Sequence, residues 1–103
     1  MRYVSTRGDS RGRSFRQVLL EGLAPDGGLY VPKHYPQLSG KQLHTLRKCD
    51  YPTVALEVLS LFGSGIPWYD LSILLRETYT KKVFGTEEIT PLKWLEPGRL
   101  ALL

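Results

Sequence analysis

The sequence predicts a small α+β domain, with about four helices packed on a short two-stranded sheet. Four segments carry apolar residues at the three-to-four-residue spacing of a helix. Two short segments are rich in the β-branched and aromatic residues that strands favour. At 103 residues, the chain is long enough for one domain with a modest core.

The two predicted strands are residues 3–6 and residues 29–31. The first alternates in character and is expected to pair with the second. Pro32 ends the second strand, because proline has no amide hydrogen to donate to a sheet. Two short strands alone would be marginally stable, so the helices are expected to pack on them.

A glycine- and proline-rich stretch, residues 22–28, precedes the second strand, and we refer to it as the glycine corner. Five of its residues are expected to shape the backbone: Gly22, Pro25, Asp26, Gly27 and Gly28. The first glycine can adopt the left-handed conformation that closes a helix, and the Pro-Asp-Gly sequence favours a tight turn. Gly28 is expected to stand where a side chain would clash. The simpler reading is an ordinary connection between a helix and a strand.

The first two helices are predicted from their start signals. Ser14 and Ser39 each have a glutamine three residues later, Gln17 and Gln42, which is the spacing of a capping box. The first helix is expected to end at Gly22. The second is short and is expected to lie on the surface.

The third and fourth helices are predicted to form an antiparallel pair that supplies most of the core. The third starts after Asp50 and ends before residues 63–65, whose Gly-Ser-Gly sequence breaks a helix. The fourth starts at Pro67 and closes near residues 81–82. Two residues are expected to face each other across this pair: Phe62 and Leu75.

After Gly85 the sequence changes character, from polar to extended and then to an apolar run at residues 99–103. That run is predicted to be a strand, and without a partner it would form an exposed apolar edge. We therefore expect residues 1–85 to form one domain and residues 86–103 to belong to the next.

The net charge of +4 comes entirely from the first sixteen residues. This N-terminal arm holds five arginines against one aspartate: Arg2, Arg7, Arg11, Arg13 and Arg16 against Asp9. The remainder has nine basic and nine acidic residues. Such an arm can bind nucleic acid, an acidic protein surface or a small phosphate ester, or it can be a solvated loop.

Several classes of site are not indicated. The single cysteine, Cys49, cannot form an internal disulfide, and His34 and His44 are not at metal-ligand spacing from it, so no metal site is expected. We expect Cys49 to be structural rather than nucleophilic, and the chain to come from the reducing cytoplasm. The longest apolar runs are short, which predicts no membrane span.

Two spaced motifs suggest a family. Residues 3–8 read YVSTRG and residues 22–32 read GLAPDGGLYVP, with Phe15 leading the helix between them. Together they resemble the N-terminal signature of threonine synthases, which are pyridoxal phosphate (PLP) enzymes much longer than this chain. Further family positions are matched by Tyr51, by the region of Tyr79 and by Thr90-Pro91-Leu92. The resemblance covers essentially the whole chain.

The resemblance implies a lyase of threonine biosynthesis, which replaces the phosphate of O-phosphohomoserine with water to give L-threonine and phosphate. That chemistry needs a lysine in Schiff-base linkage to PLP. In the family this lysine lies in a segment expected downstream of Leu103. Residues 86–103 would then be the linker and first strand of the α/β PLP-binding lobe. This chain alone is expected to bind no PLP and to be inactive, with its own C-terminal PLP-binding domain as its partner.

None of the six lysines has the sequence context of the family's Schiff-base lysine: Lys33, Lys41, Lys48, Lys81, Lys82 and Lys93. The candidates for contact with the substrate phosphate are Thr6 and Arg7, because a guanidinium binds phosphate through two parallel hydrogen bonds. The alternative is that Arg7 forms an ion pair or caps the glycine corner.

Two other functions stay open on the sequence alone. A nucleic-acid-binding module would use the arginine-rich arm, but the helices offer no basic recognition face, so we consider it unlikely. A protein-interaction module would use Trp68 or Trp94 as an exposed anchor.

Overall fold

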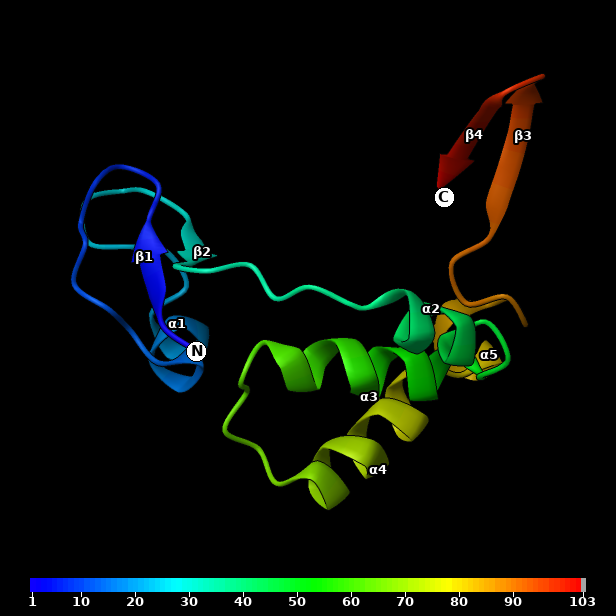
Figure 1. Ribbon diagram of the computed structural model, residues 1–103, viewed down its shortest axis with the longest axis horizontal. Coiled ribbons are helices and arrows are strands. Elements are labelled where there is room, and N and C mark those ends of the chain that lie inside the picture. Colours follow the sequence, from blue (N-terminus) through cyan, green and yellow to red (C-terminus); the bar gives the residue numbers. More distant parts are fainter. Residues whose placement is uncertain (103) are drawn as a thin grey trace.

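The computed structural model describes residues 1–102 and contains five helices and two separate two-stranded sheets (Figure 1). The elements are β1 (Tyr3–Ser5), α1 (Phe15–Glu21), β2 (Tyr30–Pro32), α2 (Gly40–Leu46), α3 (Tyr51–Leu61), α4 (Trp68–Thr78), α5 (Lys81–Phe84), β3 (Leu92–Glu96) and β4 (Arg99–Leu102). The predicted α+β class is confirmed, with one short helix and one hairpin more than predicted. No helix among the described residues is long and apolar enough to cross a membrane.

The first sheet pairs β1 with β2, as predicted, and the pairing is antiparallel with Val4 opposite Val31. The second strand runs one residue further than predicted, since Pro32 lies opposite Tyr3 as its last residue. On its other side, β1 exchanges two backbone hydrogen bonds with Arg13, each of 2.9 Å between nitrogen and oxygen. The arm therefore returns along β1 before α1 begins.

Both predicted capping boxes are present. The Ser14 hydroxyl accepts a hydrogen bond from the backbone amide of Gln17, whose side-chain oxygen accepts the Ser14 amide in return. Ser39 and Gln42 make the same pair of bonds at the start of α2. Each box satisfies two amides that a helix start leaves without an intrahelical partner.

The core lies between α3 and α4 and is small. Three leucines are buried there: Leu56, Leu71 and Leu75. The partly buried side chains packed on them are Ala55, Leu59, Ile66 and Tyr79. The prediction that Phe62 faces Leu75 is therefore not what the structure shows. Phe62 is the C-cap residue of α3, beyond the last helical turn that packs on α4, and its side chain is half-buried.

The fourth helix ends earlier than predicted. It stops at Thr78, and a separate short helix, α5, follows. The backbone leaves the helical path at Tyr79, whose ψ is 72°, and Thr80 is extended. The Thr80 hydroxyl then accepts the amide of Val83 and caps α5. Gly85, in the left-handed conformation, closes α5.

The C-terminal segment forms a hairpin rather than an unpaired strand. β4 pairs with β3 through a turn at Gly98, whose φ is 80°. The strand predicted at residues 99–103 is present over residues 99–102, where β3 is its partner, and Leu103 lies outside the described residues. The register places four exposed apolar residues on one face: Leu92, Trp94, Leu100 and Leu102. We call this set the hairpin quartet.

The chain is extended for its size. Its radius of gyration is 16.3 Å, against about 13 Å for a compact domain of this length. Its accessible surface is 7933 Å², against roughly 5900 Å² for a compact protein of this mass. Figure 1 shows why: an extended linker, residues 33–39, separates the first sheet and α1 from helices α2 to α5, and the β3–β4 hairpin projects away from those helices.

A hydrogen bond joins the first sheet to the helical pair of α3 and α4. The Tyr3 hydroxyl donates to the backbone carbonyl of Phe62 over 2.8 Å, which fastens β1 to the end of α3. Gly63 lies beside it, against Met1. The N-terminal strand is therefore held by a residue far along the sequence.

Candidate functional site

The glycine corner follows α1 directly. Gly22 caps the helix with a φ of 73°, and its amide donates to the carbonyl of Val18. The turn that follows is closed by two backbone bonds, from Gly27 to Ala24 over 2.8 Å and from Ala24 to Gly28 over 3.0 Å. Gly27 has a φ of 78°, in the left-handed region that residues with a side chain seldom adopt.

Asp26 is the centre of a hydrogen-bond network that joins the corner to the arm. Its Oδ1 accepts the Ser5 hydroxyl over 2.7 Å and the Gly28 amide over 2.9 Å. Its Oδ2 accepts the Asp9 amide over 3.2 Å. These donors favour the ionised form, so the pKa of Asp26 is lowered, chiefly by the Ser5 hydroxyl and next by the Gly28 amide.

Gly28 lies inside this network and has no room for a side chain. A Cβ at this position would lie 2.1 Å from Ser5 Oγ, 3.0 Å from the backbone nitrogen of Arg7 and 3.0 Å from Asp26 Oδ1. Its φ is not positive, so the constraint is the close approach of the YVSTRG segment and not the backbone conformation. The two sequence motifs are therefore packed against each other.

Thr6 and Arg7, the candidate phosphate contacts, lie at the edge of the same network. The Thr6 hydroxyl oxygen accepts the amide of Leu29 over 3.0 Å, which leaves its own hydrogen available to donate. The Arg7 guanidinium donates through Nη1 to the carbonyl of Asp26 over 3.4 Å and lies over Gly27. Both residues are exposed. The remaining donors of Arg7 can reach an anion, but the bond to Asp26 also gives it a structural role.

Two other arginines of the arm are paired within the chain. Arg11 binds Asp9 with 2.7 Å between Nη2 and Oδ2, and its side-chain and backbone bonds lower the pKa of Asp9 to about 2. Arg13 lies 3.5 Å from Glu21 at the end of α1. Glu21 also accepts a hydrogen bond from the Tyr30 hydroxyl. Most of the excess charge is therefore held close to acidic or carbonyl oxygens.

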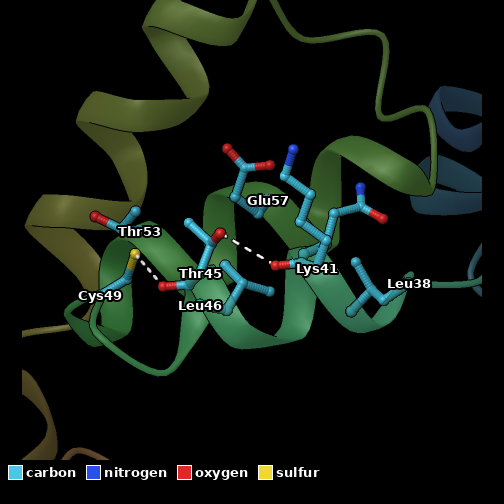
Figure 2. Close-up of a pocket in the computed structure, with 8 residues that line it drawn as sticks. Leu38, Lys41, Thr45, Leu46, Cys49, Thr53 and Glu57 are labelled. Atoms are coloured by element: carbon cyan, nitrogen blue, oxygen red, sulfur yellow. Dashed lines mark hydrogen bonds between the residues drawn. The ribbon is translucent and has the colours of Figure 1, made fainter.

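A cleft between α2 and α3 is the second candidate site (Figure 2). It is lined by Leu38, Lys41, Gln42, Thr45, Leu46, Cys49, Thr53 and Glu57. Figure 2 shows the Cys49 thiol directed to the backbone carbonyl of Thr45, 3.6 Å away. A carbonyl cannot take a proton from a thiol, so this contact does not activate Cys49 as a nucleophile.

The described residues do not fit a PLP site. All six lysines are exposed, and Lys81 is paired with Glu87 over 2.9 Å. A Schiff-base lysine is normally activated in a desolvated pocket or beside another cation. Within residues 1–102, no group of histidine, cysteine, aspartate and glutamate side chains is placed to hold a metal ion.

The two motifs that pack at this corner lie within a region that matches a known family. A family model described as "Threonine synthase N terminus" matches residues 2–79. The chain belongs to this family. The expectation drawn from the YVSTRG and GLAPDGGLYVP motifs is thereby confirmed, and the glycine corner that they build is part of the family's N-terminal region.

Individual relatives agree. The chain is similar to threonine synthase of Methylobacillus glycogenes, at 44% identity over 93% of this chain and 22% of the relative. It is similar to threonine synthase of Corynebacterium glutamicum, at 45% identity over 93% of this chain and 21% of the relative. A protein named threonine synthase-like 2, from Xenopus laevis, is 37% identical over 95% of this chain and 21% of its own length.

Solved structures show the same fold. A PLP-bound threonine synthase from Brucella melitensis superposes with a TM-score of 0.83 and 42% identity, over 99% of this chain and 22% of that one. Threonine synthase from Escherichia coli superposes with a TM-score of 0.73 over the same shares. The chain thus spans about a fifth of the length of the relatives it matches.

Sequence analysis missed the roles of Ser5 and Asp9. Both were visible, Ser5 inside the YVSTRG motif and Asp9 as the one acidic residue of the arm. Their bonds to Asp26 cross 21 and 17 residues, respectively, and no local pattern indicates such a contact. Asp26 could be assigned only its local part, as a turn residue.

Proposed function

We propose that this chain is the N-terminal portion of a threonine synthase, an enzyme that converts O-phosphohomoserine and water to L-threonine and phosphate with PLP as its cofactor. The observation that supports this most is its similarity to threonine synthases at 40–45% identity, along nearly its whole length. In this proposal the portion orients and covers the catalytic lobe and does not catalyse the reaction alone. The protein would act in the cytoplasm.

The chemistry divides between the two parts. The cofactor would supply the electron sink, held by a lysine outside residues 1–103. The exposed lysines of the described residues support this division, because none lies in a desolvated pocket. What this chain would contribute is a rigid corner, in which Asp26 and Gly28 lock the YVSTRG segment in place.

The domain boundary that we propose falls near Gly85, with residues 1–85 as the N-terminal domain and residues 86–103 as the linker and first strand of the PLP-binding domain. The hairpin quartet supports it. Its four apolar side chains are 49% to 69% exposed, and an isolated two-stranded hairpin is marginally stable in water. A sheet or helix of the catalytic lobe would cover this face.

Thr6 and Arg7 are the residues that we propose for contact with the substrate phosphate. The Thr6 hydroxyl retains a hydrogen to donate, and Arg7 uses one of its five N–H donors on the Asp26 carbonyl. A guanidinium fixed at a corner in this way loses little side-chain entropy on binding an anion. The competing reading, that Arg7 only braces the corner, rests on the same hydrogen bond.

The proposal is tested with the full-length protein, loaded with PLP and supplied with O-phosphohomoserine. We expect threonine and phosphate to form in equal amounts. The organic product must be identified, because the chain is similar both to threonine synthases and to a protein named threonine synthase-like 2, and the N-terminal region alone does not distinguish between them. Phosphate release without threonine would contradict the proposal.

The alternative functions are less well supported. A nucleic-acid-binding role would need free cations along the arm, whereas Arg11 and Arg13 are paired with acidic residues. An interaction role has a specific observation in its favour, since Trp68 and Trp94 are 61% and 69% exposed. Contact with the catalytic lobe would account for both tryptophans without a separate partner protein.

A further inference from the structure

Helix α1 carries apolar side chains on two sides. Phe15 packs toward the first sheet, with its ring centroid 6.1 Å from that of Tyr3. Leu19 and Leu20 are 68% and 87% exposed. Arg16 and Gln17 border these two leucines. Exposed apolar side chains that lie together with a polar rim are typical of an interaction surface.

A groove lies beside these two leucines, and we call it the α1 groove. It is lined by Phe15, Arg16, Leu19 and Leu20 of α1, and by Ser64, Gly65, Ile66 and Pro67 of the connection between α3 and α4. Ser64 is buried, and its hydroxyl accepts the amide of Ile66. The lining is mostly apolar, with a single charged residue.

That residue, Arg16, differs from the other arginines of the arm. The others have oxygen partners: Arg2 binds the Gly12 carbonyl, Arg7 the Asp26 carbonyl, Arg11 the Asp9 carboxylate and Arg13 the Glu21 carboxylate. Arg16 makes no hydrogen bond or ion pair with any residue among 1–102, and its carbons run beside Gly65. The α1 groove therefore combines apolar walls with one cation available for a carboxylate.

We propose that the α1 groove docks a segment of the catalytic lobe of the full-length protein, one that presents an apolar side chain to Leu19 and Leu20 and a carboxylate to Arg16. This inference rests on the proposed function and names the contact surface. Charge complementarity calls for an acidic group beside the cation. A lobe joined to this domain by a covalent link is present at high effective concentration, which favours it over a second copy of the chain.

The test uses full-length Leu20→Lys and Arg16→Glu. Lysine near the end of a helix and glutamate in its first turn both suit the helix dipole, so neither change should harm an exposed α1. If the groove is covered, each variant buries a misplaced charge, and we expect Tm to fall by about 4 °C or more. Leu43→Lys and Lys41→Glu, at exposed positions of α2, are matched controls that should leave Tm within about 1 °C.

A second measurement needs no variant. In hydroxyl-radical footprinting of the full-length protein, Leu20 should be oxidised at least tenfold more slowly than its exposure in this structure implies, with small-peptide leucine as the reference. An unprotected Leu20, or an unchanged Tm in both test variants, would overturn the inference even if the protein makes threonine. A Leu20→Lys variant that converts a dimer to a monomer would overturn it in favour of a second copy. If the wild-type protein made no threonine, the proposed function would be refuted but the docking surface would not, because the protection of Leu20 is measured without the reaction.

Discussion

Replacing Gly28 by alanine should destabilise the glycine corner, chiefly through a clash with one atom, Ser5 Oγ. The added Cβ would meet Ser5 Oγ at 2.1 Å, far inside contact distance, and the Arg7 backbone nitrogen at 3.0 Å. Overpacking of this kind costs about 1–3 kcal/mol. Because the first contact is with a hydroxyl that also binds Asp26, the chain must either move its backbone or break that hydrogen bond.

The assay is a double-mutant cycle in the 103-residue chain, read by urea unfolding with circular dichroism. In a Ser5→Ala background the closest clash disappears, so Gly28→Ala should cost less there, by about 1 kcal/mol or more of coupling free energy. Gly27→Ala should cost about 1–2 kcal/mol in both backgrounds, because its penalty comes from the left-handed conformation. Gly40→Ala, where the added Cβ meets open space, should be neutral or slightly stabilising. Additive costs for Gly28→Ala and Ser5→Ala would refute the packing argument.

Three further outcomes are expected. The free energy of unfolding should fall as pH drops from about 5 toward 2, because Asp9 and Asp26 have lower pKa values in the folded state than in the unfolded state, and their contribution is lost as they protonate. Asp26→Asn should make the free energy of unfolding less dependent on pH, and an unchanged dependence would argue against the Asp26 network. Leu75→Ala should lower the free energy of unfolding in urea by about 2–5 kcal/mol, whereas Leu74→Ala, at a neighbouring position that is 49% exposed, should lower it by less than about 1 kcal/mol. Equal losses would mean that α4 packs through a different face. Arg7→Ala in the full-length protein should lower kcat/KM for O-phosphohomoserine by more than about tenfold with Tm nearly unchanged, since one guanidinium–phosphate interaction is lost. A lower Tm with unchanged kinetics would instead favour a purely structural role for Arg7 at the glycine corner.

Start signals were the part of the fold that the sequence predicted best. Ser14, Ser39 and Asp50 each cap a helix through a hydrogen bond to a residue three positions later, so the whole interaction is encoded locally. Helix ends were harder to predict. The break at Tyr79 and Thr80 separates α4 from α5, and the local sequence is compatible both with a continued α4 and with a capped α5.

Contacts between distant segments could not be predicted in the same way. The prediction that the third and fourth helices supply most of the core is confirmed, but Leu56 and not Phe62 is the buried residue of α3, because the partner helix decides which side is covered. The hairpin was missed since β3 contains lysine and glutamate among its apolar residues, which obscures the strand pattern. At the corner, Gly28 was expected to be sterically required, while the atom that requires it, Ser5 Oγ, came only from the structure.

The hydrogen bond from Tyr3 to Phe62 has a consequence for how the chain folds during synthesis. It closes a loop of 59 residues, whereas α3 and α4 are joined by a short connection, and the difference in closure entropy is about 2 kcal/mol. The helical pair can therefore form as soon as both helices have left the ribosome. β1 can pair with β2 as soon as residue 32 has been made, but its link to the helical pair, through Tyr3, must wait until the end of α3 has been made. The first sheet and the helical pair can therefore each form before they are joined to each other.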